Sequence, residues 1–94
     1  VVGYAAGQME TASRDSSTQR AGDQWFELEE LYVDRAHRSR GLGGRLLDYV
    51  EGQLRGQGVR RVMLTGADRD QGALLRFYLR RGMTLYSFRA FRDL

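Results

Sequence analysis

A closely spaced run of glycines constrains the fold of this chain more than any other feature of the sequence. Gly41, Gly43 and Gly44 follow a strand-like segment and open a stretch whose apolar residues recur with helical spacing. Those apolar residues are Leu42, Leu46, Leu47, Val50 and Leu54. They share one face, which predicts an amphipathic helix over residues 43–55 that ends at Gly56 and Gly58. A glycine loop that opens a helix leaves backbone N–H groups free at the positive end of the helix dipole, where a phosphate or pyrophosphate binds well.

The glycine loop alone does not specify its ligand. No Gly-Lys-Ser/Thr follows, so the loop is not a P-loop, and its glycine spacing departs from the dinucleotide-binding fingerprint. The same pattern also fits a helix start that needs small residues for packing.

The rest of the chain alternates between strand and helix patterns. We expect strands at residues 1–9, 25–33, 59–65 and 83–91, a polar surface loop at 10–23, and a second helix from Asp68 or Asp70 to Gly82. Strand-helix-strand alternation in the second half predicts an α/β sheet with right-handed crossovers. The 94 residues suffice for one hydrophobic core, so residues 1–94 are interpreted as a single domain.

The strand at residues 25–33 carries more acids than a structural strand needs. Strict alternation predicts Glu27 and Glu29 on one face with Trp25, Leu31 and Val33, and Glu30 on the other face with Phe26, Leu28 and Tyr32. Each acid alone is also consistent with a solvated or salt-bridged side chain.

Composition excludes several classes of protein. There is no cysteine and only one histidine, so we expect no disulfide and no metal site. All 15 basic residues are arginine against 12 acids, and the resulting charge of +3 favours anionic ligands. Nucleic-acid binding is disfavoured because the aromatic residues fall on core-like positions and do not interleave with a basic stripe. With no apolar run of membrane-spanning length and no signal-peptide pattern, no membrane partner and a cytoplasmic location are expected.

Two segments resemble the GNAT superfamily of acyl-CoA-dependent N-acetyltransferases. Arg38, Gly41 and Gly43 match its (Gln/Arg)-x-x-Gly-x-(Gly/Ala) motif and follow an acidic strand that ends in Val33-Asp34. Residues 73–83 are similar to the family's helix that ends in Phe-Tyr and is followed by Gly-Phe, with Met83 in place of the phenylalanine. The ordered pair is more specific than either segment alone.

The resemblance implies an enzyme that moves an acetyl group from acetyl-CoA to a primary amine of a small molecule or protein, by direct attack in a ternary complex without a covalent enzyme intermediate. It implies that the backbone of Leu31, Tyr32 and Val33 pairs with the pantetheine amides and that the loop at residues 38–44 holds the pyrophosphate. That loop comprises Arg38, Ser39, Arg40, Gly41, Leu42, Gly43 and Gly44. Arg38, Arg40 or Arg45 would add a contact to phosphate, and Gln71 stands where the family usually has an asparagine that contacts CoA.

For catalysis, Tyr78 is similar in position to the tyrosine that protonates the departing CoA thiolate, although its helical position also fits a core aromatic. A phenol suits this role because its pKa of about 10 lies near that of the thiol. Glu29 and Glu27 are equal candidates for the general base. A backbone N–H near Val33 would polarise the carbonyl oxygen.

The resemblance covers nearly all of this chain but only the C-terminal part of the usual domain. The expected fold is therefore a GNAT-like mixed sheet with two helices, without the family's N-terminal strand-helix-helix-strand elements, which form much of the acceptor pocket. The exposed sheet edge this leaves favours a homodimer or complementation by an N-terminal segment. A non-catalytic CoA-binding or protein-interaction module is the alternative function.

Overall fold

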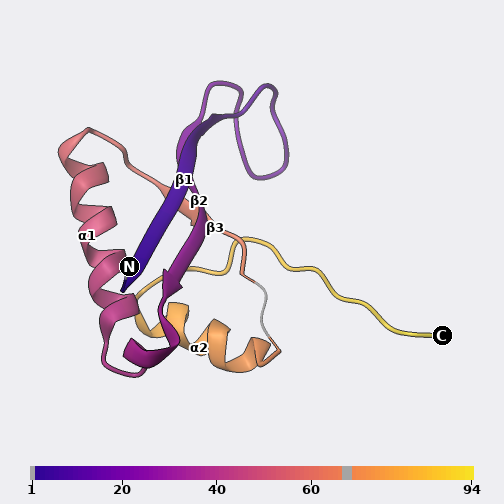
Figure 1. Ribbon diagram of the computed structural model, residues 1–94. Coiled ribbons are helices and arrows are strands. Elements are labelled where there is room, and N and C mark those ends of the chain that lie inside the picture. The colour runs from indigo at the N-terminus through magenta and orange to yellow at the C-terminus, as the bar shows by residue number, and fades with distance from the viewer. Residues whose placement is uncertain (1, 67–68) are drawn as a thin grey trace.

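The computed structural model describes residues 2–66 and 69–94 and shows a small α/β fold (Figure 1). Strands β1 (Gly3–Thr11), β2 (Gln24–Val33) and β3 (Val62–Leu64) form one mixed sheet in the order β1-β2-β3. A short 3-10 helix, η1 (Arg35–His37), precedes helix α1 (Leu42–Gly56), and helix α2 (Gln71–Arg80) follows β3. The predicted mixed sheet with two helices is confirmed.

β1 and β2 form an antiparallel hairpin around the polar loop. β1 continues to Thr11, two residues into the predicted loop, and the loop closes where the Ala12 amide donates to the Asp23 carbonyl at 2.8 Å. Ala12 itself is buried at the base of the loop. The loop is thus anchored to the end of the sheet opposite the glycine run (Figure 1).

A β-bulge interrupts this hairpin in the middle of the acidic strand. Ala6 pairs with Glu30, but the next residue, Gly7, pairs with Leu28, so Glu29 is the extra residue on β2. A bulge of this kind reverses the in-and-out alternation of the side chains that follow it.

Strict alternation along β2 was therefore a wrong expectation. A Cβ added at Gly7 would lie 2.7 Å from the Phe26 ring, and one added at Gly3 would lie 3.7 Å from Leu46 of α1. Gly3 and Gly7 share a face of β1, and Gly3 pairs with Val33. Phe26 and Val33 therefore both face α1, although alternation assigned them to opposite faces.

β3 is shorter than the strand predicted at residues 59–65. It pairs parallel to β2 only from Phe26↔Val62 to Leu28↔Leu64. Beyond Leu28 the two strands separate, because the bulge at Glu29 follows at once and the chain leaves β3 after Leu64. The sheet is consequently split at the end where β2 runs toward the glycine loop.

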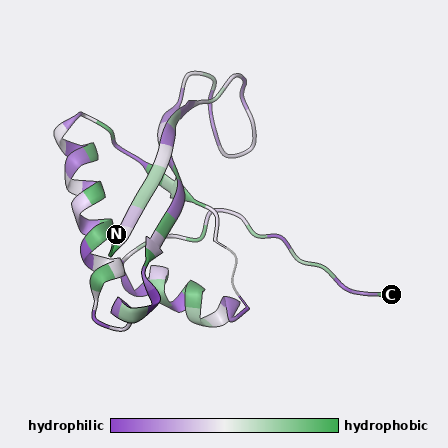
Figure 2. Cartoon of the chain, viewed as in Figure 1, coloured by the Kyte–Doolittle hydropathy of each residue, from purple (hydrophilic) through white to green (hydrophobic). Residues whose placement is uncertain are grey.

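The core lies between α1 and the sheet. Leu47 has no exposed surface and Leu28 only 3%. Hydrophobic and hydrophilic stretches alternate along α1 (Figure 2), as the predicted amphipathic helix requires. One face of buried or half-buried side chains on α1 thus covers the hairpin.

Helix α2 is capped and held against α1. The Asp70 side chain accepts a hydrogen bond from the Ala73 amide at 3.0 Å, which confirms Asp70 as the N-cap; the alternative, Asp68, lies outside the described residues. At the other end, Arg81 pairs with Asp48 of α1, and its guanidinium occupies the space that a side chain at Gly44 would fill.

The strand predicted at residues 83–91 is wrong. After α2 the chain forms no helix or strand. It first passes the sheet, where the Tyr86 hydroxyl donates to Thr18 Oγ1 of the β1–β2 loop at 2.5 Å, and then runs away from the fold (Figure 1), with Leu85, Phe88 and Phe91 at 56%, 80% and 90% exposure. The alternating pattern favours a strand, but a strand requires a hydrogen-bonding partner, and no described strand pairs with this segment. β3, with three residues, offers little edge for it.

Candidate active site

The split between β2 and β3 forms a groove of about 380 Å³. Its walls come from the second half of β2, the end of β3, one residue of β1 and the inner face of α2. The lining residues are Tyr4, Leu28, Glu29, Glu30, Leu31, Tyr32, Leu64, Thr65, Gly66, Leu74 and Tyr78. The groove thus brings Tyr78 and Glu29 together with two of the predicted cofactor-binding residues, Leu31 and Tyr32.

The backbone of β2 offers hydrogen-bonding groups to this groove. The Asp34 amide donates to the Val2 carbonyl at 2.6 Å, so residue 34 points its backbone groups toward β1. The backbone N–H and C=O groups of successive residues point to alternate sides of an antiparallel strand. The backbone groups of Tyr32 therefore also point toward β1, whereas those of Leu31 and Val33 point away from β1, into the gap left by β3. Before the bulge the even-numbered residues face β3, since the Phe26 amide donates to the Arg61 carbonyl at 2.9 Å. The bulge therefore determines which amides reach the groove.

The glycine loop has the predicted geometry. Ser39 and Gly41 have φ angles of 64° and 73°, in the left-handed region, and Gly41 is the N-cap of α1. The first helical hydrogen bond runs from the Arg45 amide to the Gly41 carbonyl at 3.1 Å. The amides of the intervening residues, 42–44, donate to no backbone acceptor outside the helix within residues 2–66 and 69–94. They are free at the helix N-terminus, in the loop that directly continues β2.

The loop arginines differ in their surroundings. Arg38 folds back along β2: its Nε donates to the Val33 carbonyl at 2.9 Å, and its guanidinium lies 5.8 Å from the centre of the Tyr32 ring. Arg40 and Arg45 are exposed. Leu42, which the sequence places on the apolar face of the helix, is half-buried. Gln71 is exposed in the first turn of α2 and is absent from the groove lining found in the described part of the chain.

The position of Tyr78 is compatible with both interpretations that the sequence left open. Its ring is half-buried, packs edge-on against Phe77 with 5.1 Å between centroids, and passes close to Gly66 at the end of β3. It also lines the groove. Burial raises the pKa of Tyr78 above its ordinary value of 10.0, so the phenol keeps its proton at neutral pH.

The carboxylates of β2 are not equivalent. Glu29, at the bulge, is exposed and lines the groove, whereas Glu27 lies outside the lining and accepts a hydrogen bond from Trp25 Nε1 at 3.0 Å. The predicted pair is therefore separated, and Glu29 is the member that shares the groove with Tyr78.

Two groove residues could not be identified from the sequence. Tyr4 donates its hydroxyl hydrogen bond to Glu30 Oε2 at 2.6 Å, and this bond raises the pKa of the Tyr4 phenol. Alternation had placed Glu30 on the face opposite the other acids, and Tyr4 carried no motif. Only the bulge and the pairing of β1 with β2 bring them to the groove.

Comparison with known families establishes the relationship of this chain. The family model for the acetyltransferase (GNAT) family matches residues 1–83. The chain belongs to the GNAT acetyltransferase family. Among curated proteins, none matches the sequence.

Solved structures share this GNAT fold. They include a GCN5-related N-acetyltransferase from Ralstonia eutropha (TM-score 0.71, 20% identity), which matches 98% of this chain and 57% of its own length. An acetyltransferase from Trypanosoma brucei has a TM-score of 0.68 and 25% identity, and the match covers 99% of this chain and 59% of that protein. Glucosamine-6-phosphate N-acetyltransferase from Arabidopsis thaliana has a TM-score of 0.67 and 17% identity, and the match covers 98% of this chain and 56% of that protein. This chain therefore spans less than two thirds of the length of each.

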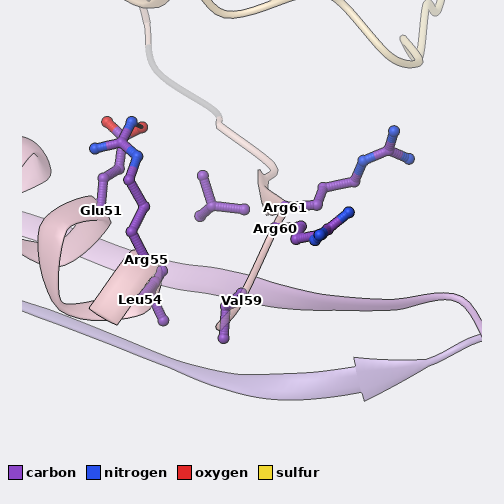
Figure 3. Close-up of a pocket in the computed structure, with 7 residues that line it drawn as sticks. Glu51, Leu54, Arg55, Val59, Arg60 and Arg61 are labelled. Atoms are coloured by element: carbon purple, nitrogen blue, oxygen red, sulfur yellow. Dashed lines mark ion pairs between the residues drawn. The ribbon is translucent and has the colours of Figure 1, made fainter. Parts of the chain in front are cut away.

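Outside the groove, the described residues of this GNAT chain offer little else that could hold a ligand. Among them there is no group of three or more His, Asp and Glu side chains placed to hold a metal ion, and no helix long and apolar enough to cross a membrane. A second hollow of about 70 Å³ lies between the end of α1 and the start of β3 (Figure 3). There Glu51 pairs with Arg55 at 3.6 Å, while Arg60 and Arg61 point away from them.

Proposed function

We propose that this chain is the acetyl-CoA-binding part of a GNAT N-acetyltransferase that moves an acetyl group from acetyl-CoA to a primary amine by direct attack in a ternary complex. The observation that carries the proposal is the groove itself. One wall presents the backbone of Leu31, and Tyr78 stands on the other. The same strand continues through Val33 toward the free amides of the glycine loop.

The donor set suits the chemistry of CoA. Amides at the N-terminus of α1 and the arginines of the loop, Arg38, Arg40 and Arg45, favour the pyrophosphate oxygens, and glycines at 41, 43 and 44 allow the backbone to approach them. The backbone groups of Leu31 and Val33 match the spacing at which an added strand pairs, so the pantetheine amides fit beside β2. Acetyl-CoA supplies the activated acyl group as a thioester.

The side chains divide the proton transfers between them. Glu29 takes a proton from the acceptor's ammonium group, which frees the nitrogen lone pair to form the C–N bond to the acetyl carbon. A backbone N–H near Val33 stabilises the negative charge on the carbonyl oxygen. As the C–S bond breaks, Tyr78 gives its phenolic proton to the CoA sulfur and recovers a proton from solvent. The products are the N-acetylated amine, which loses its remaining extra proton to solvent, and CoA thiol.

The chain in isolation also supports a second candidate, a CoA-binding or protein-interaction module without turnover. Two features favour it: the exposed apolar tail after α2, and the edge of β3 that no other strand of the described residues covers. A second copy or a further segment could cover either one. In that case the groove binds CoA but no acceptor reaches it.

A thermal melt of the chain titrated with acetyl-CoA and with free CoA tests the proposal. Binding to the folded state raises the melting temperature with ligand concentration, by an amount equivalent to about 2.7 kcal/mol at 100 times Kd. An amine screen that follows CoA thiol release then separates the two candidates. A shift without turnover favours the module, and no shift with either ligand removes both.

A further inference from the structure

The three glycines at the start of α1 have different surroundings. A Cβ added at Gly41 would meet nothing within 4 Å, so that position is open. One added at Gly43 would lie 3.8 Å from the ring of Phe77 on α2, which is an ordinary van der Waals distance. One added at Gly44 would lie 2.6 Å from a terminal guanidinium nitrogen of Arg81. The glycine run therefore faces open space at its first position and the end of α2 at its last.

Arg81 links the last turn of α2 to the first turn of α1. Its guanidinium pairs with Asp48, one turn after Gly44 on the same helix, and lies where Gly44 leaves room by having no side chain. Arg81 is the C-cap residue of α2, and its amide donates to the Tyr78 carbonyl at 3.1 Å. The contact with α1 is thus within one helical turn of the phenol that lines the groove.

Burial contributes little to the position of α2. No residue of this helix is fully buried, and Leu75 and Leu79 are exposed. The Arg81 side chain is only 26% exposed, against 73% for Arg55, which pairs with Glu51 within α1. A guanidinium that is mostly enclosed loses less of its attraction to solvent screening than an exposed one does. The pair of Arg81 with Asp48 is therefore well placed to hold a helix that packing leaves loosely fixed.

We propose that Arg81 is a positioning residue, which together with Gly44 and Asp48 fixes α2 against the first turn of α1 and so sets the distance of Tyr78 from β2. This inference rests on the proposed function, in which Tyr78 gives its proton to the CoA sulfur. Proton transfer requires the two heavy atoms to approach to about 2.6–3.2 Å, so a small displacement of α2 slows it. The same displacement leaves the free amides of the glycine loop in place, so phosphate binding is preserved.

Substitution of Arg81 should change turnover more than affinity. With the full chain and acetyl-CoA, Arg81→Ala should lower kcat about tenfold and keep KM for acetyl-CoA within about twofold, because a misplaced group slows the chemical step alone. Arg81→Lys keeps the positive charge beside Asp48 and should recover part of the loss. Glu51→Gln removes a carboxylate that pairs with Arg55 at 3.6 Å and should leave both constants unchanged.

Three kinetic results would overturn the inference even if acetyl transfer is observed. The first is a parental kcat for Arg81→Ala, and the second is an equal loss of kcat with Glu51→Gln. The third is a rise in KM for acetyl-CoA as large as the fall in kcat, which would make Arg81 a direct contact of the cofactor.

Gly44→Ala tests whether the glycine acts through Arg81. The added methyl group would displace the end of a flexible side chain, so the fold should tolerate it while the pair with Asp48 is lost. Gly44→Ala should therefore lower kcat about as much as Arg81→Ala, and the double variant should show no further loss, since both changes remove the same contact. Gly52→Ala is the control, because a Cβ added there meets nothing within 4 Å, and it should keep the parental kcat. Additive losses in the double variant would contradict a shared contact.

A distance measurement decides the inference if the chain shows no turnover. The chain has no cysteine, so spin labels can be attached through Tyr49→Cys on α1 and Leu79→Cys on α2, both exposed positions. Arg81→Ala and Gly44→Ala should broaden or shift the distance distribution that pulsed EPR measures between the labels, whereas Gly52→Ala should not. An unchanged distribution in the first two variants overturns the inference. The melting shift with acetyl-CoA reports separately on the proposed function.

Discussion

The glycine at position 41 allows the proposed pyrophosphate site to be separated from the stability of the fold. Gly41 has a φ of 73°, and a Cβ added there would meet nothing within 4 Å. Gly41→Ala therefore lowers the free energy of unfolding only through the left-handed backbone strain, by about 1–2 kcal/mol. The smaller entropy of the unfolded chain offsets about 0.4–1 kcal/mol of this loss. The net loss of about 1 kcal/mol lowers the melting temperature of a domain this size by about 4–8 °C.

Gly58 is a matched control for this substitution. It lies just beyond the other end of α1, has a φ of 80°, and also has open space where a Cβ would be added. Gly58→Ala should therefore lower the melting temperature of the ligand-free chain by a similar amount. Only Gly41→Ala should also reduce the rise produced by acetyl-CoA, because a methyl group at residue 41 obstructs the approach of phosphate to the loop amides.

The assay is a set of thermal melts of the parent chain and both variants across acetyl-CoA concentrations. A tenfold loss of affinity removes about 1.4 kcal/mol of ligand stabilisation at saturating concentrations. A full ligand-induced rise in Gly41→Ala, or an equal loss of that rise in Gly58→Ala, would contradict the placement of the phosphate at the loop amides. Gly41→Asn, which tolerates the left-handed conformation better, should restore part of the ligand-free stability.

Three further outcomes are expected. Tyr78→Phe should lower kcat about 100-fold in the CoA-release assay by removing the general acid. Tyr49→Phe, which changes a side chain on α1 that is 65% exposed, should leave kcat unchanged. Equal rates for Tyr78→Phe and the parent would remove Tyr78 from the mechanism. Leu47→Ala should cost about 2–5 kcal/mol in chemical denaturation because its side chain is fully buried, and Leu75→Ala, at 41% exposure, should cost clearly less. Burial raises the pKa of Tyr78, so the contribution of the protonated phenol to stability is complete below pH 10.0 and is lost as the pH rises through the higher pKa of the folded state. Tyr78→Phe should flatten this alkaline decline of the melting temperature in pH-dependent melts. An unchanged decline would show that Tyr78 does not cause it.

Local patterns predicted most of the elements. Apolar spacing located α1, the glycines marked its ends, and Asp70 was a candidate N-cap before the structure showed its hydrogen bond. These features depend on residues within a few positions of one another. The segment at residues 83–91 shows the limit of such patterns, because a strand-like alternation cannot report whether a neighbouring edge exists.

The groove required information from distant parts of the chain. No local pattern marked Glu29 as the bulged residue, since a bulge follows from the pairing of β2 with β1. That single extra residue turned the Leu31 and Val33 amides toward the gap and separated Glu27 from Glu29. It also brought Glu30 beside Tyr4, 26 positions away in the chain.

The residue order alone therefore established the α/β class, the amphipathic helix, the glycine loop and the family resemblance, because each depends on spacing along a continuous segment. The three-dimensional pairing of strands established where the groove opens, which carboxylate shares it with Tyr78, and that the C-terminal segment pairs with no described strand. Strand register is a relation between segments far apart in the chain, and it is expressed only when β1, β2 and β3 pack together against α1.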